Sequence, residues 1–244
     1  MNYNKRKNEE QEESNKRICQ VMDSKLLDVK NALDQVKSLF SNQLFGDNFP
    51  SIMWKHQCYP LIKNRSKVDI ELSKFCDDGL IVSFKLGSTI TNTDTALIYT
   101  EDYINYLRSN YNGNALEKFI DKVLTVNSSS TYTSTQLKNE YQFTEDQIKE
   151  LVHNGVLAVH RTVGSWLLSL PNCGHFYKTF TAGRNALLSM IKRTKYHEVN
   201  RTELFARKLP KDVQLGIAYH VLDLIGGDFV QCTEYPNGTM LRLL

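Results

Sequence analysis

The sequence predicts an α+β, mainly helical fold of three tandem winged-helix domains, each a helical bundle with a two-stranded β-hairpin wing. The main observation is a repeat: in three places a short amphipathic helix ends at a glycine and two apolar strands follow. The three glycines, Gly79, Gly155 and Gly227, lie 76 and 72 residues apart, which is typical of a small unit repeated along a chain. A two-stranded hairpin is marginal on its own, so its apolar strands should pack against the helices.

The 244 residues divide into four predicted segments. Residues 1–23 are polar and charged and should form a disordered tail, because they cannot bury enough apolar surface to fold. The three winged helices are then expected at residues 24–110, 111–171 and 172–244. The chain starts without the apolar stretch of a signal peptide and holds no run long enough for a membrane helix, so no membrane partner is expected. Its five cysteines form no CxxC pair, which favours a reduced intracellular compartment.

The first predicted domain opens with a helix that ends at the stretch FGDNFP. One face of this helix is marked by apolar residues at steps of three and four, namely Leu26, Val29, Leu33, Val36 and Phe40. A second helix is expected over residues 52–59, stopped by Pro60, and a third from Ser66 to Gly79. The apolar runs LIVSFKL and TALIYT predict a strand pair, and TEDYINYLRSN predicts a closing helix.

The second predicted domain begins with ALEKFIDKVL, an amphipathic helix, and SSSTYTSTQ follows as a linker or turn. The letters TEDQ fit a capping box, in which Thr144 and Gln147 satisfy the first free N–H groups of the next helix. That helix has a buried stripe formed by Ile148, Leu151 and Val152, and Gly155 ends it. The runs VLAVH and SWLLSLP predict the strands of the wing.

The third predicted domain uses GRNALLSMIKRTKYHEV, TELFARKL and VQLGIAYHVLDLIGG as helical stretches. Its strands are FVQCTEY and TMLRLL, joined by PNG, and Asn-Gly is the strongest short signal for a hairpin. Its apolar stripe is slipped in register relative to the other two copies. In every copy, the helix before the glycine is the candidate recognition helix.

Basic residues gather in one part of the chain. Residues 160–211 contain ten Lys or Arg residues against two Glu, a charge of +8, whereas the whole chain has a net charge of +3 and the remainder is therefore −5. Such an asymmetry favours a surface that binds a polyanion. The alternative explanation is a basic helical face that is merely solvated.

A helical wheel of RNALLSMIKRTKYHE separates an apolar arc from a basic face. The arc consists of Leu187, Leu188, Met190 and Ile191. Lys192 and Arg193 fall more than a right angle from its centre, and Lys195 borders it. We therefore expect binding to double-stranded DNA that is dominated by phosphate contacts, with weak base preference. The predicted DNA-binding residues are Arg184, Lys192, Arg193, Lys195, Arg161, Lys178 and Arg201.

The sequence holds no convincing enzyme motif. HRT at 160–162 and DFV at 228–230 loosely resemble the HRD and DFG motifs of protein kinases, but Thr162 cannot act as the base and Val230 replaces the glycine. A glycine-rich phosphate loop and a strand lysine are also missing. The six histidines show no metal-ligand spacing. No catalytic residue, no metal and no cofactor is expected.

Several long blocks, in the same order, resemble the serine/threonine-protein kinase 19 family. They include WKHQCYPLIKNRSKVDIELSKF, LVHNGVLAVH, GSWLLSLPNCGHFYKTFTAGRNALLSMIKRTKYHEV and AYHVLDLIG, and the likeness covers residues 49–243. The resemblance implies a nuclear protein of three winged helices that binds duplex DNA. It also implies a role in transcription-coupled nucleotide excision repair, in which the protein bridges DNA, stalled RNA polymerase II and repair factors. The block around Arg184, Lys192, Arg193 and Lys195 matches the family's DNA-contacting region.

Two other functions stay open at the level of sequence. One is an atypical serine/threonine protein kinase, as the family name suggests. The other is a protein-binding adaptor that makes no DNA contact, since winged helices also serve in this way and the acidic remainder of the chain would suit it. Self-association also stays open.

Overall fold

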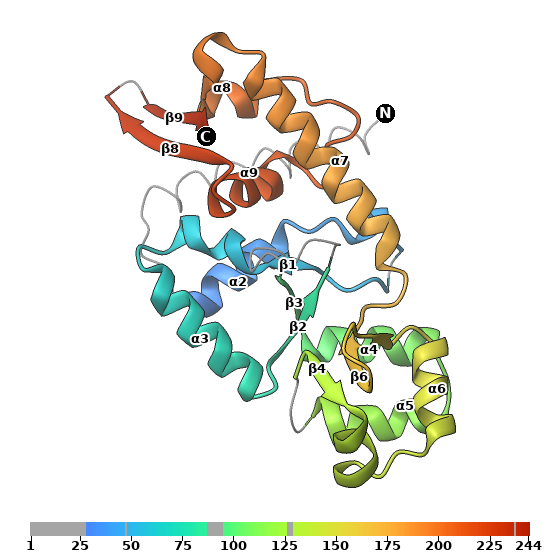
Figure 1. Ribbon diagram of the computed structural model, residues 1–244. Coiled ribbons are helices and arrows are strands. Elements are labelled where there is room, and N and C mark those ends of the chain that lie inside the picture. The colour runs from blue at the N-terminus through green and yellow to red at the C-terminus, as the bar shows by residue number, and fades with distance from the viewer. Residues whose placement is uncertain (1–27, 47, 87–94, 126–128, 237) are drawn as a thin grey trace.

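A computed structural model describes residues 28–46, 48–86, 95–125, 129–236 and 238–244 (Figure 1). The predicted disordered tail at residues 1–23 and Asn237 of the expected PNG turn lie outside the described residues. The strands form three separate three-stranded antiparallel sheets. The first lies near the middle of the view in Figure 1, the second at the lower right and the third at the top.

The first sheet is surrounded by helices from the N-terminal part of the described chain. Its segment contains, in order, α2 (Val29–Ser38), η1 (Asn42–Leu44), β1 (Met53–Trp54), η2 (Lys55–Leu61), α3 (Arg65–Asp77), β2 (Ile81–Lys85), β3 (Thr95–Tyr99) and α4 (Thr100–Asn110). Asp28 caps α2 and Asn64 caps α3, because each side-chain oxygen accepts a hydrogen bond from a free N–H group of the first turn. Strand β3 lies between β1 and β2.

The second and third sheets repeat this arrangement. The second segment contains α5 (Asn114–Phe119), the π-helical η3 (Ile120–Leu124), β4 (Thr131–Thr133), the π-helical η4 (Gln136–Glu140), α6 (Glu145–His153), β5 (Leu157–Val159) and β6 (Ser165–Leu168). The third contains α7 (Cys173–Lys192), η5 (Lys195–His197), β7 (Glu198–Asn200), α8 (Arg201–Ala206), α9 (Ile217–Gly226), β8 (Val230–Tyr235) and β9 (Gly238–Leu243). Each sheet places its last strand in the middle, in the orders β1-β3-β2, β4-β6-β5 and β7-β9-β8.

The two-stranded wings that the sequence predicts are each joined by a third, short strand. Strand β1 falls where a helix was expected over residues 52–59, and β4 falls within the predicted linker SSSTYTSTQ. The backbone of Met53 and Trp54 pairs with β3, so a helix begins only at Lys55 and takes the tighter 3-10 form through Pro60. The predicted capping box is confirmed, with Thr144 and Gln147 each bonded to the other's backbone N–H.

The helix ends follow the predicted repeat in two copies and depart from it in the third. Gly79 and Gly155 adopt left-handed φ values of 70° and 74°, which favour glycine at a helix C-terminus. Gly227 does not, and the left-handed residue is Asp228, with φ of 56°. The third copy is therefore shifted by one residue, and Gly227 lies in close contact instead: a Cβ there would lie 2.8 Å from the ring of Phe229.

The long helix α7 contributes to both hydrophobic cores, as α9 also does. The N-terminal half of α7 places Phe176 and Phe180 against Trp54 in the large core that the first two sheets share, where Trp54 and Phe180 stack at 4.7 Å. Its C-terminal half places Leu187 and Ile191 in a second core beneath the third sheet. The predicted boundary at residue 172 therefore begins a helix that belongs to two cores.

Helix α9 is the expected recognition helix of the third copy, and the structure corrects that expectation. It packs closely on η2, so closely that a Cβ on Gly226 would lie 1.8 Å from the carbonyl oxygen of His56. Gln57 donates a hydrogen bond to the Tyr219 carbonyl oxygen at 2.9 Å. All residues of α9 except Ile225 are buried. This helix therefore joins two parts of the protein and has no face left for a DNA groove.

A buried carboxylate lies at the centre of this contact. Asp223 of α9 is fully buried and accepts hydrogen bonds from Arg184 of α7 at 2.7 and 2.8 Å, and its Oδ1 lies 2.7 Å from His56 Nε2. Burial opposes ionisation of Asp223, but the hydrogen bonds from His56 and Arg184 outweigh it and hold the pKa of Asp223 below its usual value. The Arg184 guanidinium also lies over the rings of Phe180 (4.5 Å) and Phe229 (4.8 Å).

Replacing Arg184 by Met should therefore destabilise the fold. Asp223 would be left buried with only His56 as a partner, and breaking a buried ion pair on one side costs about 3–5 kcal/mol of unfolding free energy. Lys192→Met, at an exposed position of the same helix, should change stability by less than about 0.5 kcal/mol. Urea unfolding of both variants is the measurement. Equal stability of the two variants would show that the Asp223 network is not needed.

His220 should make the stability depend on pH. Its ring is fully buried and stacks on Phe180. Burial is the main cause that lowers its pKa from 6.5 to about 4, and the Arg184 charge adds to this while Asp223 opposes it. Below about pH 6.5, His220 of the unfolded chain therefore binds a proton. In the folded protein the same side chain stays neutral until the pH falls to about 4. From about pH 7 to about pH 5 this group should remove about 2 kcal/mol of unfolding free energy.

The variant His220→Gln, which cannot titrate, isolates this contribution. Between about pH 7 and about pH 5, its unfolding free energy should fall by about 2 kcal/mol less than that of the unchanged protein. If both proteins lose stability in parallel on acidification, His220 is not the group responsible.

Candidate nucleic-acid interface

Helix α7 has an exposed polar stripe on the face opposite its buried residues. Lys178, Asn185 and Lys192 follow one another at intervals of seven residues and are all exposed, since seven residues complete almost two helical turns. Phe180, Leu187 and Ile191 line the buried side. The apolar arc that the wheel predicts is confirmed at Leu187 and Ile191.

Three exposed cations lie at, or just beyond, the C-terminal end of α7. We call Lys192, Arg193 and Lys195 the basic corner. Within the described part of the chain, no carboxylate forms an ion pair with any of them, so their charges are available to a ligand. Cations are also favoured there by the negative end of the helix dipole. A phosphate that binds the corner must therefore be held by these side chains and not by the helix itself.

The turn after α7 holds the corner in an uncommon backbone conformation. Tyr196 and His197 are adjacent, and both adopt left-handed φ values, of 64° and 55°. Each such residue costs about 1–3 kcal/mol of strain. Two hydrogen bonds hold the turn: His197 Nδ1 donates to the Lys192 carbonyl oxygen at 2.7 Å, and the His197 backbone N–H donates to Thr194 at 3.1 Å. Tyr196 is 69% exposed. The Lys195 ammonium nitrogen lies over its ring, 4.9 Å from the ring centroid.

Two more predicted residues are exposed but lie away from the corner. Lys178 is on the same face of α7 as Lys192, about 21 Å away along the helix axis. Arg161 lies in the turn between β5 and β6, which belongs to the second sheet. In Figure 1 that sheet lies at the opposite end of the molecule from the C-terminal end of α7. The structure therefore does not gather these residues into one compact site.

Two predicted DNA-binding residues do not belong to an exposed basic face. Arg184 is directed into the protein, where Asp223 neutralises it, and its side chain is 16% exposed. Arg201 is the first residue of α8 and is 7% exposed. Its side chain lines a groove of about 710 Å³ between η2, the start of α3 and β8, together with Arg65 and Asp228. The charge of Arg184 thus serves a contact within the protein, and Arg201 is too buried to belong to an exposed basic face.

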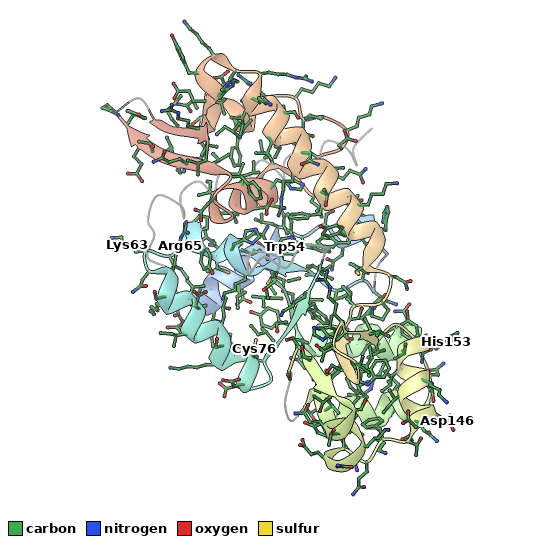
Figure 2. The ribbon with its side chains drawn as sticks, viewed as in Figure 1. Trp54, Lys63, Arg65, Cys76, Asp146 and His153 are labelled. Carbon is green, nitrogen blue, oxygen red and sulfur yellow. The ribbon has the colours of Figure 1, made fainter. Side chains whose placement is uncertain are left out.

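The other expected recognition helices offer few free cations. On α3, Arg65 pairs with Asp228 at 2.7 Å and Lys67 pairs with Glu71 at 3.5 Å. Helix α6 exposes Glu145 and Asp146 in its first turn. Figure 2 shows Asp146 and His153 projecting from α6 at the edge of the molecule, and Lys63 and Arg65 at the opposite edge, near the start of α3. Neither helix presents a continuous positive face to DNA.

Two lysines that the wheel did not include are also exposed next to α7. Lys208 and Lys211 lie on the connection between α8 and α9. This connection passes close to α7 at Gly183, where an added Cβ would lie 3.2 Å from the Asp212 carbonyl oxygen. A glycine in the middle of an otherwise regular helix is the sequence signal that could have indicated this close approach.

The kinase-like letters do not form an active site. His160 closes the turn of the second wing, where the Thr162 backbone N–H donates to its ring nitrogen at 3.2 Å, whereas Asp228 pairs with Arg65 beside the third sheet. Among the described residues, no three His, Cys, Asp or Glu side chains gather as a metal site. A helix that is both long enough and apolar enough to span a bilayer is likewise not found in the described part of the chain.

Comparison with known proteins places the chain in a family. A family model described as "Inactive serine-threonine protein kinase 19" matches residues 42–243. The chain is 36% identical over 218 residues to winged helix repair factor 1 of Mus musculus, covering 88% of this chain and 85% of that protein. It is 36% identical over 216 residues to the protein of the same name from Homo sapiens, covering 87% and 84%. A more distant relative, serine/threonine-protein kinase mug51 of Schizosaccharomyces pombe, is 29% identical over 130 residues, covering 51% and 41%. The chain therefore belongs to the inactive serine-threonine protein kinase 19 family, which is the family its sequence resembles.

Proposed function

We propose that this protein is a non-enzymatic scaffold of three tandem winged-helix domains that binds double-stranded DNA in the nucleus and acts in DNA repair. The three domains would span residues 24–110, 111–171 and 172–244. The common order of helices and strands in the three segments supports the domains, and the name of the mammalian relatives supports the repair role. The observation that carries the proposal is the basic corner, because three exposed cations without carboxylate partners in the described chain suit a polyphosphate.

Binding would rest on phosphates more than on bases. Reading a base edge in the major groove requires a helix or strand with free polar side chains. Helix α9 is buried, and α3 and α6 carry paired or acidic side chains. The ammonium and guanidinium groups of the basic corner can neutralise backbone phosphates without a defined base partner. The binding mode would differ from a typical helix-turn-helix, because the end of the first helix of its domain provides the contacts.

Several observations support a function without catalysis. The family model is described as inactive, and the two kinase-like motifs lie in different hairpins, with Asp228 engaged by Arg65. A kinase would also require a site that holds Mg-ATP, and thermal stabilisation that rises with Mg-ATP concentration would reveal one.

The family resemblance extends the proposal to transcription-coupled nucleotide excision repair. In this role the protein would bridge DNA, stalled RNA polymerase II and repair factors. Separate surfaces within the fold support this role: the basic corner lies beside the third sheet, while α6 of the second segment presents Glu145 and Asp146, each paired with a lysine, and suits a protein partner better than DNA. A protein-binding adaptor without DNA contact would use only the second of these surfaces.

Reversing the charge of the basic corner should weaken duplex binding. The variant Lys192→Glu, Arg193→Glu, Lys195→Glu would remove about three phosphate contacts. Since each neutralised phosphate contributes about −0.9 to the slope of log affinity against log salt, the slope should become less steep by about 2–3. Fluorescence anisotropy with a blunt duplex, titrated at several salt concentrations, measures this slope.

A matched control separates the site from net charge. The variant Lys30→Glu, Lys74→Glu, Lys122→Glu changes the net charge by the same amount at exposed positions of the first two segments. It should keep most of the salt slope. Equal losses in the two triple variants would remove the basic corner from the proposal, and an unaltered protein without salt-dependent duplex binding would favour the adaptor.

A further inference from the structure

The side chain of Tyr196 is a second binding element at the basic corner. From the exposure and the backbone of this residue, we infer that its ring is a stacking platform for one unpaired DNA base, so that the preferred ligand is a duplex with an adjoining single strand. This inference rests on the proposed DNA binding and adds the class of DNA to it. The ring is 69% exposed, and Lys195, the last cation of the corner, directly precedes it in sequence.

The backbone conformation at Tyr196 indicates that the exposed position of its ring is imposed by the fold. A left-handed conformation is unfavourable for an aromatic residue, and Gly or Asn would adopt it at lower cost. The chain nevertheless has Tyr196 and His197 in this conformation, held by the contacts of His197 with Lys192 and Thr194. Val199, which follows in β7, is buried and fixes the other end of the turn. The tyrosine is thus directed outward by structure on both sides.

The chemistry of the corner matches a nucleotide. An aromatic ring stacks on any base, because every base has a π face, and nearby cations hold the phosphates on either side. The Lys195 ammonium lies over one face of the ring, 4.9 Å from its centroid, so a base would stack on the opposite face with this ammonium close by for a phosphate. Lys192 and Arg193 can continue along the backbone.

An intact duplex offers no face to this ring. Its bases are already stacked on one another, so a tyrosine at the surface could contact only the backbone or a groove edge. An unpaired base at a junction exposes its π face beside a duplex whose phosphates the basic corner can bind. The combination of one exposed ring with several cations therefore fits a junction better than a blunt end.

The test is the ratio of two affinities. Anisotropy titrations at one salt concentration would compare a duplex carrying a short single-stranded extension with a blunt duplex of the same length. The unaltered protein should bind the extended DNA about tenfold more tightly, which is the gain in affinity expected from stacking one base on an aromatic ring. Tyr196→Phe keeps the ring and should keep the ratio. Tyr196→Asn removes the ring, suits the left-handed backbone and should bring the ratio close to one.

Tyr235 provides the matched control. It is 56% exposed at the end of β8 and lies outside the basic corner, so Tyr235→Asn should leave the ratio unchanged. A ratio that survives in Tyr196→Asn, or that Tyr196→Phe abolishes, would overturn the stacking role. If the unaltered protein shows salt-dependent binding to the blunt duplex but no preference for the extension, the inference fails while the proposed function stands. If it binds neither DNA, both fail.

Discussion

The fold depends on the buried carboxylate of Asp223 and the two side chains that hold it. Arg184 comes from α7, His56 from η2 and Asp223 from α9, so one charge joins elements that lie 167 residues apart in sequence. An unpaired carboxylate in this position would be strongly unfavourable, which is why both partners are required together. The close packing of Gly226 on the His56 backbone brings the helices near enough for these hydrogen bonds to form.

This arrangement changes the use of a common supersecondary unit. In a helix-turn-helix protein the second helix of the motif enters the DNA groove. Here the corresponding helix of the third segment, α9, is inside the protein, and its polar side chains serve contacts between segments. Positive charge is found instead at the end of α7, with Lys192 and Arg193. The order of secondary structure is thus retained while the surface available to a ligand is a different one.

Sequence patterns predicted the parts of this protein that depend on local chemistry. The long apolar strands, the capping box at Thr144 and the glycine turns at Gly79 and Gly155 all follow from neighbouring residues, and the structure has them. The short strands β1, β4 and β7 carry two or three residues each and have no neighbouring strand in the sequence with which to form a hairpin, unlike the equally short β5, which directly precedes β6. They form because a longer strand elsewhere in the chain provides hydrogen-bonding partners.

The candidate site was predicted in part, for a similar reason. Lys192, Arg193 and Lys195 are exposed, but α7 ends at Lys192, so Lys195 lies in η5 and not on the continuous helix that the wheel assumed. Arg184 could have been recognised as inward-facing, because it lies three and seven residues before Leu187 and Ile191 on the buried side. Its partner Asp223 could not, since nothing local links the two residues. The left-handed backbone at Tyr196 could not be predicted either, because tyrosine has no preference for that conformation.

Helix α7 has a mechanical consequence for whatever binds at its end. Its N-terminal half is fixed in one core by Phe176 and Phe180, and its C-terminal half in the other core by Leu187 and Ile191. The helix therefore cannot rotate within one core without disturbing the packing of the other. A ligand bound at the C-terminal end of α7 would therefore have a fixed orientation relative to the second segment, which lies at the other end of this 20-residue helix. The helix therefore sets both the distance and the direction between its C-terminal end and the second segment.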